Sequence, residues 1–354
     1  MSPLIALDPL RDAVFALAGA IVLLALALQV ERAVAAFQES RAGRKEALLT
    51  GLVYRVIQGA SCITEVEALS RFERRMVRGI LLRLAPDLRG ESSVGIADLY
   101  RRLGLLQADL RRLRSRRPLT RASAAADLGL VRAAEALPAL TKALDDPDVR
   151  VRQTTVWALG QAGGPDTLAA LVPVLGDSDV TVARRAQEVL AERGQEVKDA
   201  ILTFVGKSTS RPGRLAAIEL LGWLRISGGA ELLLGFMGDL DPEVRVKSVK
   251  AAAAVGDPRF MGVFHRLLND PRWEVRCQAA KGLTVFGSPD SVPFLEKSLR
   301  DPHWWVRFYV ATALSEAGPR GEEILQQALC DPDPPVRDMA RYLLERGSAV
   351  PVLP

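Results

Sequence analysis

Apolar and polar positions recur with a period of about 31 residues over the last two thirds of the 354-residue chain. In one period Val275, Ala279 and Leu283 follow at intervals of four, which places them on one face of an α-helix. Glycines that permit a left-handed C-terminal residue close five such runs, at Gly163, Gly194, Gly256, Gly287 and Gly318. A second amphipathic run follows the glycine in four periods, over residues 168–175, 260–268, 292–299 and 324–329. Each period therefore predicts a helix, a turn and a second helix.

Charged positions repeat in phase with the apolar ones. An arginine, which we call the ladder position, recurs at 121, 152, 214, 245, 276 and 307, and at 337 one residue early, with Ala183 in its place once. An aspartate stands six residues before this position in most periods, and proline follows it in four. Aspartate is a good N-cap and proline is tolerated at the first helical position, so each Asp-Pro is predicted to open a helix.

The repeated charges allow a functional and a structural interpretation. They could form a charged ladder that grips a partner, or they could join the repeats to one another. A residue that every unit needs is more often architectural, and an arginine stem can pack along a groove while its head bonds carbonyls or a neighbouring aspartate. We therefore assign a structural role to Arg152, Arg245, Arg276, Arg307, Arg337, Asp146, Asp270, Asp301 and Asp331.

A fixed period of this size is typical of stacked helical repeats, which cannot cover their apolar faces alone. The motif Asp-Pro-x-x-x-Val-Arg, with the small, leucine and glycine positions behind it, resembles HEAT repeats, and more narrowly the short HEAT-like repeats of the bilin-lyase type. The resemblance implies an all-α solenoid of about eight helix pairs over residues 116–350, with a tail at 351–354. It also implies an alternative function, because the bilin-lyase repeats bind tetrapyrrole chromophores.

The N-terminal region contains an uncharged run of 18 residues, 13–30, after a short tail at 1–12. Three interpretations compete: a cleaved signal peptide, a buried core helix and an uncleaved membrane anchor. The run has no clear cleavage site, and its length reaches the lower bound for a spanning helix. We expect a single transmembrane helix at 13–32. Basic residues concentrate on its C-terminal side, which predicts an outside N-terminus and a cytoplasmic solenoid at the plasma or bacterial inner membrane.

Residues 33–115 are expected to form a basic helical segment that caps the solenoid. Between residues 41 and 121 there are 18 basic and 8 acidic side chains, whereas the whole chain has a net charge of only +5. The surplus could be a solvated face, or it could attract anionic lipid headgroups beside the anchor through Arg71, Arg74, Arg75 and Arg78. Nucleic acid is a weaker third reading, because the anchor makes lipid a sufficient explanation.

Few residue types that support catalysis are present. The chain has two histidines, His265 and His303, and three widely separated cysteines without a CxxC spacing. This pattern argues against a disulfide framework and a structural zinc site. No pair of nucleophile and base stands out. We predict a protein that is not an enzyme and has no catalytic site, cofactor or metal.

The predicted partner surface follows the helix that carries the ladder arginine. Positions three before, one after and five after the ladder position are expected to face the groove, and aromatic residues concentrate there in the last units. The candidate contact residues are Trp273, Trp304, Trp305, Phe308, Val246, Lys250 and Lys281. Packing of the tryptophans between units is an equally open alternative, and Trp157 and Trp223 are assigned to core or inter-repeat packing. The leading function is a membrane-anchored scaffold that binds a protein partner; the alternatives are a lyase-like or chromophore-handling helper and a nucleic-acid-binding solenoid.

Overall fold

The computed structural model describes residues 29, 43–58, 65–66, 68–207 and 210–346, and every regular element within these ranges is helical. The chain divides into two units, Met1–Asp109 and Leu110–Pro354. The predicted segments 1–12, 13–32 and 351–354 lie outside the described residues, apart from Gln29. Among the helices that the structure does describe, none is both long enough and apolar enough to cross a bilayer. The membrane anchor and the predicted segment boundaries remain predictions.

The first unit is a group of short amphipathic helices. It contains a helix over residues 43–57, α3 (Arg71–Leu84), α4 (Glu91–Arg102) and the start of α5 (Leu105–Arg112). Ser70 and Glu73 form a capping box at the start of α3: the Ser70 hydroxyl accepts from the Glu73 amide at 3.3 Å, and the Glu73 carboxylate accepts from the Ser70 amide at 2.9 Å. The apolar faces of α3 and α4 are buried.

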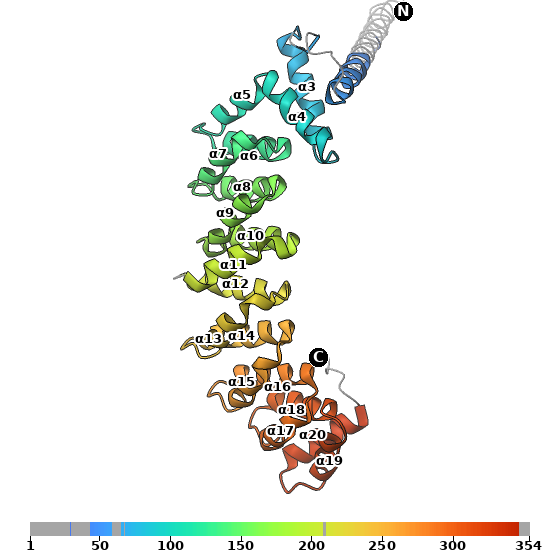
Figure 1. Ribbon diagram of the computed structural model, residues 1–354, viewed down its shortest axis with the longest axis vertical. Coiled ribbons are helices and arrows are strands. Elements are labelled where there is room, and N and C mark those ends of the chain that lie inside the picture. Colours follow the sequence, from blue (N-terminus) through green and yellow to red (C-terminus); the bar gives the residue numbers. More distant parts are fainter. Residues whose placement is uncertain (1–28, 30–42, 59–64, 67, 208–209, 347–354) are drawn as a thin grey trace, which may run out of the picture. The chain divides into compact units, whose positions relative to one another are not determined.

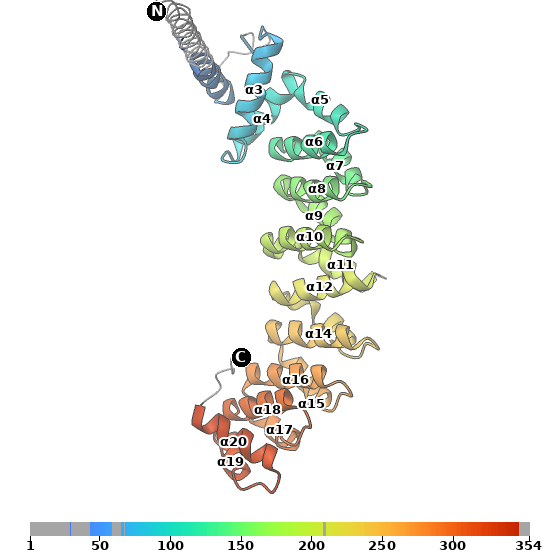
Figure 2. The ribbon, with the colours of Figure 1, turned by 180° about the vertical axis from the view of Figure 1, so that it is seen from behind.

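The second unit is a two-layer stack of helices (Figures 1 and 2). One layer holds the helices that carry the ladder position, which we call the ladder helices. They are α6 (Pro118–Val131), α8 (Val149–Ala162), α10 (Val180–Glu192), α12 (Arg211–Trp223), α14 (Pro242–Val255), α16 (Trp273–Phe286), α18 (Trp304–Glu316) and α20 (Pro334–Arg346). Each ladder helix packs against the next, which confirms the predicted all-α solenoid for the described residues. These residues contain eight ladder helices and seven helices of the other layer, so the last of the eight predicted pairs is not complete there.

The other layer holds shorter helices, most of them adjoined by a 3₁₀ turn. They are α7 (Leu137–Ala143), α9 (Pro165–Leu171), α11 (Lys198–Lys207), α13 (Ala230–Phe236), α15 (Met261–Leu267), α17 (Val292–Ser298) and α19 (Pro319–Ala328). The core lies between the layers. The predicted apolar positions fill it: Val275, Ala279 and Leu283 are each at most 1% exposed.

The predicted helix starts are wrong by two residues in most repeats. In α8 the N-cap is Asp148, whose side chain accepts from the Arg150 amide, and Asp146 lies outside the helix. Asp146 instead accepts from the Asp148 amide at 2.9 Å, a turn closed by the side chain. Pro147 therefore sits in the turn and not at the first helical position. The prediction failed because an Asp-Pro pair suits such a turn as well as it suits a cap. An Asp-Pro pair does open two of the ladder helices, α14 at Asp241-Pro242 and α20 at Asp333-Pro334.

The predicted helix ends are confirmed. All five glycines named from the pattern have positive φ, and Gly256 and Gly287 are left-handed C-terminal residues of α14 and α16. Arg132 and Arg225 adopt the same conformation after α6 and α12, where no glycine is present. These two ends could not be read from glycine positions.

Candidate functional site

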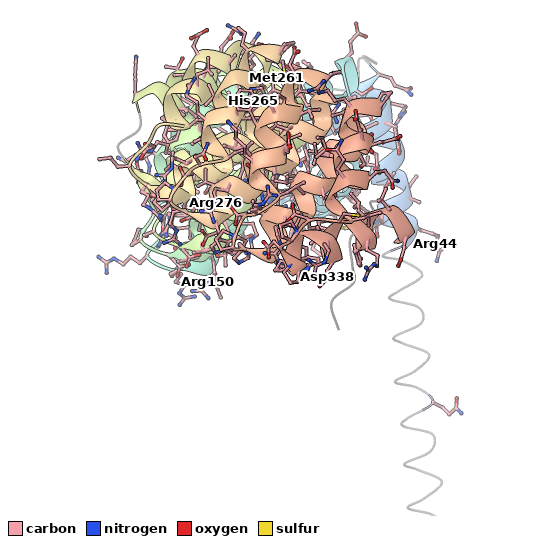
Figure 3. The ribbon with its side chains drawn as sticks, turned by 90° about the horizontal axis from the view of Figure 1, so that it is seen from below. Arg44, Arg150, Met261, His265, Arg276 and Asp338 are labelled. Atoms are coloured by element: carbon pink, nitrogen blue, oxygen red, sulfur yellow. The ribbon has the colours of Figure 1, made fainter. Side chains whose placement is uncertain are left out.

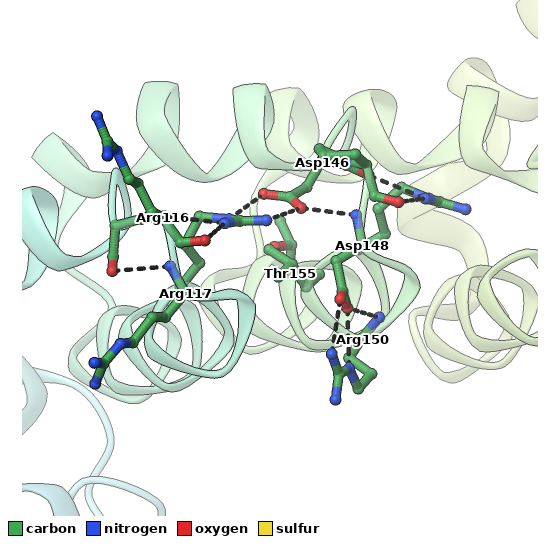
Figure 4. Close-up of polar contacts among 11 residues, drawn as sticks. Arg116, Arg117, Asp146, Asp148, Arg150 and Thr155 are labelled. Atoms are coloured by element: carbon green, nitrogen blue, oxygen red, sulfur yellow. Dashed lines mark hydrogen bonds and ion pairs between the residues drawn. The ribbon is translucent and has the colours of Figure 1, made fainter.

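An arginine at the ladder position and the aspartate 25 residues later form an ion pair that joins two repeats. We call each such pair a rung. Arg121 donates from Nε and Nη2 to the two carboxylate oxygens of Asp146 at 2.7 Å, and from Nη1 to the Ser115 carbonyl at 2.9 Å (Figure 4). The Asp146 bond is the main reason why the pKa of Arg121 is raised. The same fork joins residues 25 apart in the pairs Arg152–Asp177, Arg245–Asp270 and Arg276–Asp301. Because these arginines are only 11–14% exposed, their heads are used within the chain.

The remaining predicted ladder residues keep only part of this geometry. Arg307 and Arg337 donate to the carbonyls of Asp301 and Asp331, respectively, at 2.8 and 2.6 Å. Among the described residues, Nε of Arg307 is buried without a hydrogen-bond partner, and Asp331 pairs with Arg300 instead. All nine residues that were assigned to the ladder therefore make contacts within the repeats.

One arginine–aspartate pair of the ladder is missing because neither of its two positions is charged. Ala183 occupies a ladder position, and the residue 25 positions later is Ser208 where the other rungs have aspartate. The next rung is also weak, since Arg214 and Asp239 approach only to 3.6 Å and Nε of Arg214 is buried without a hydrogen-bond partner in the described chain. The ladder is thus interrupted between α10 and α12.

The ladder helices present a face that points away from the second layer. Figure 3 shows Arg150 and Asp338 of α8 and α20 on the opposite side of the stack from Met261 and His265 of α15. We call the residues one, two and five after the ladder position on α8 to α18 the outer stripe. It runs from Gln153 on α8 to Thr312 on α18. Leu215, Cys277 and Phe308 within it are buried, and its other side chains are at least partly exposed and form the surface available to a partner.

The structure separates the predicted partner residues into two groups. Lys250 and Lys281 are exposed on the outer stripe, Val246 is half-buried there, and Trp304 and Trp305 are partly exposed at the start of α18. Lys281 lies 5.3 Å from the ring centre of Tyr309, within reach of a cation–π interaction.

Two of the predicted partner residues are used for packing. Phe308 is fully buried, with its ring stacked on Trp304 at 5.4 Å between centroids, so its assignment as a contact residue is wrong in this packing. Trp273 stacks on His303 of the next repeat at 3.7 Å. Phe308 stands directly after its ladder arginine and is covered by Trp304 and by Tyr342 of the next ladder helix, whereas Trp273 stands three residues before its arginine and is covered by His303 alone among the rings.

The sequence interpretation missed two tryptophans on this face. Trp223, assigned to packing, is 57% exposed and lies with Lys247 and Lys250 around a cavity of about 40 Å³ between α12 and α14. Trp157 is half-buried and lines a cavity of about 500 Å³ between α8 and α10 with Arg184 and Arg185. A signal was present for Trp157, because it stands five residues after the ladder position, the register of the exposed Lys250.

The arginines predicted to meet lipid headgroups are not equivalent. Arg71 and Arg75 are exposed, and Arg74 donates from Nε to the Leu69 carbonyl at 3.0 Å. Arg78 is half-buried and donates to the Tyr100 hydroxyl at 3.1 Å and to buried Asp109 at 2.8 Å, so its head is used within the first unit. Burial of Tyr100 raises its pKa, so the phenol stays neutral within this cluster.

Cys277 and the possible metal ligands of the described residues bear on whether this chain has a reaction centre. Burial raises the pKa of the Cys277 thiol to about 11, the opposite of what an activated nucleophile requires. Within the described ranges no three His, Cys, Asp or Glu side chains gather in a way that could hold a metal ion.

Comparison with known proteins supports a HEAT-repeat family. A family model described as HEAT repeats matches residues 108–191 and 260–345, the two stretches on either side of the interrupted ladder. No curated protein sequence matches the chain.

Several solved structures resemble the chain at low sequence identity. Kap121p is 15% identical with a TM-score of 0.41 over 83% of this chain, which spans only 45% of that protein. YibA of E. coli is 19% identical (TM-score 0.42) over 75% of this chain and 96% of its own. The complex of CpcE and CpcF of phycocyanin lyase from Nostoc sp. PCC7120 is 18% identical (TM-score 0.32) over 66% and 94%.

Proposed function

We propose that the protein is a membrane-anchored HEAT-repeat scaffold that binds a protein partner on its outer stripe and organises an assembly at the cytoplasmic face of the membrane. The observation that carries the binding role is the composition of this face. It holds partly exposed aromatic rings beside cations, the combination that recurs at protein interfaces. The ladder charges form hydrogen bonds and ion pairs within the repeats. The outer stripe is therefore the part of the ladder helices that can contact a partner.

The anchoring part of the proposal is supported by residues 13–30, whose uncharged length approaches that of a spanning helix. The full chain is expected to stay in the membrane fraction under alkaline extraction. The double variant Leu24→Arg with Leu26→Arg is expected to release it, because each central charge costs about 3 kcal/mol on insertion scales. Equal extraction of both proteins would remove the membrane from the proposal.

The scaffold role is tested by photo-crosslinking of the full chain in native membranes. A photoreactive phenylalanine analogue replaces Lys250 on the outer stripe or, as a matched control, Arg266, which is exposed on α15 in the other layer. We expect a discrete protein adduct from position 250 and none from position 266. Adducts of equal yield at both positions, or a coloured ligand or nucleic acid at 250 in place of protein, would contradict the scaffold.

A further inference from the structure

Aromatic rings and cations form three sets along the outer stripe. Two of the rings belong to the stripe, and the third, Trp223, stands nine residues after the ladder position and lies at its edge beside Lys247 and Lys250. Trp157 on α8 shares a cavity with Arg184 on α10, and Trp223 on α12 shares one with Lys250 on α14. Tyr309 on α18 lies under Lys281 on α16. The sets occupy every second junction between ladder helices, so they repeat at two-unit intervals along the stack.

Each set contains one cation without a carboxylate partner. The stripe carries five basic and two acidic side chains. Both acids are already paired: Glu188 with Arg185 at 3.1 Å and Glu219 with Lys247 at 2.6 Å. Arg184, Lys250 and Lys281 make no salt bridge within the described residues, and each belongs to a different aromatic set. An incoming carboxylate at any of them would meet an unneutralised charge beside an apolar ring.

We propose that the outer stripe binds an extended, acidic segment of the partner protein. Its carboxylates would pair with the three unpaired cations, and apolar side chains between them would cover Trp157 and Trp223. Adjacent helices pack about 8–10 Å apart, so successive sets lie roughly 16–20 Å apart. An extended chain rises about 3.3 Å per residue, so the acidic and apolar pairs of the segment should recur about every five or six residues. This inference rests on the proposed scaffold role.

A protein segment suits this charge density better than nucleic acid does. Duplex DNA presents one negative charge per ~1.7 Å of axis, and proteins that bind it neutralise several phosphates with closely spaced cations. The stripe offers one free cation per set and includes two carboxylates that would face the phosphates. An acidic peptide requires only the separated charges that are present.

The test uses the full chain in detergent and a fluorescein-labelled 18-residue peptide with Asp-Asp-Phe repeated every six residues. Binding is measured by fluorescence anisotropy at two salt concentrations. The triple variant Arg184→Glu, Lys250→Glu and Lys281→Glu is expected to weaken binding at least tenfold. The matched control reverses three exposed cations of the other layer, Lys142, Arg266 and Lys297, and is expected to change affinity less than twofold.

The outcomes separate this inference from the scaffold role. Equal losses in the triple variant and its control would overturn the inference, as would equal binding of a peptide with Lys in place of Asp. Tighter binding of a 20-nucleotide single strand, lost in the triple variant, would assign the stripe to nucleic acid. If position 250 still crosslinks to a protein while the acidic peptide does not bind, only the acidic segment is rejected and the scaffold stands.

Discussion

Arg245 is the most enclosed of the paired ladder arginines: its side chain is 11% exposed and that of its partner Asp270 is 6% exposed. Removing one partner of a buried pair leaves an unpaired charge, which typically costs about 3–5 kcal/mol. We therefore expect Arg245→Ala to lower the midpoint of urea unfolding strongly. Arg245→Lys should recover little, because a lysine cannot bond both carboxylate oxygens and the Asp239 carbonyl at once.

The matched control for Arg245 is Arg259→Ala. Arg259 pairs with Glu231 at 2.7 Å, but the two side chains are 55% and 80% exposed, and such surface pairs contribute about 0–1 kcal/mol. A loss of stability in Arg259→Ala as large as in Arg245→Ala would show that the ladder has no special role in joining repeats.

Low pH should weaken the cap of α8, because the Asp148 carboxylate that forms this cap becomes protonated. The hydrogen bond from Arg150 is the main cause that lowers the pKa of Asp148 to about 2, from an ordinary value of 3.8. Because the folded pKa is depressed, this carboxylate stabilises the fold above about pH 4, and the contribution is lost as pH falls through 2. Asn can still cap a helix but carries no charge. The difference in melting temperature between the native chain and Asp148→Asn should therefore be largest at pH 5 and become much smaller as the pH falls to 2; a constant difference would contradict it.

The contacts of the ladder residues could be predicted from the sequence in part. The periodic arginine and aspartate predicted that these residues bond within the repeats, and the fork between Arg152 and Asp177 has that geometry. The pairing partner 25 residues away could have been found from the common period. The position of the cap could not, because Asp146 and Asp148 are both good capping residues and only the path of the turn decides between them.

At the scale of the element, close approach of ladder helices depends on glycine. A methyl group added at Gly129 on α6 would lie 2.5 Å from Cα of Ala158 on α8, where the neighbour is backbone and cannot turn away. We expect Gly129→Ala to destabilise the chain by about 1–3 kcal/mol, the usual cost of overpacking. Thermal unfolding followed by circular dichroism measures the effect.

Gly235 on α13 provides the control for Gly129. It is exposed, and an added methyl group would meet nothing within 4 Å. Gly235→Ala should raise stability by about 0.5–1 kcal/mol, because alanine loses less conformational freedom in a helix. If both substitutions shifted the melting temperature in the same direction, the close approach of α6 and α8 would not limit the residue at 129.

The elements themselves were predictable because helical periodicity and glycine ends are local signals. Exposure on the outer stripe was less predictable, since it depends on how far each helix overlaps its neighbour. Phe308 and Trp223 show both errors. Phe308 is covered by Trp304 and Tyr342, whereas Trp223, the last residue of α12, is 57% exposed although Gly222 beside it packs closely on Ala251 of α14. Repeat register predicts which side a residue faces but not the depth to which it is buried.

At the scale of the second unit, the ladder divides the stack into two blocks. Intact rungs join α6, α8 and the turn before α10, and again α14, α16 and the turn before α18. Between α10 and α12 the rung is replaced by Ala183 and Ser208. There Gly213 of α12 approaches Gly176, at 3.2 Å for an added methyl group, so packing and not an ion pair holds the junction. In a solenoid, stability is nearly a sum of units and nearest-neighbour interfaces, so a weak interface uncouples its two sides.

Urea unfolding of the native chain should therefore show two transitions, with Trp157 reporting the first block and the other tryptophans the second. A Trp157→Phe variant assigns the fluorescence changes.

The double variant Ala183→Arg with Ser208→Asp supplies both halves of the missing rung and should bring the transitions together. Each single variant should gain little, because it adds one charge without a partner; residues that pair usually show a coupling energy of about 0.5–3 kcal/mol. A single transition in the native chain, or additive effects of the two substitutions, would mean that the missing rung does not limit coupling between the blocks.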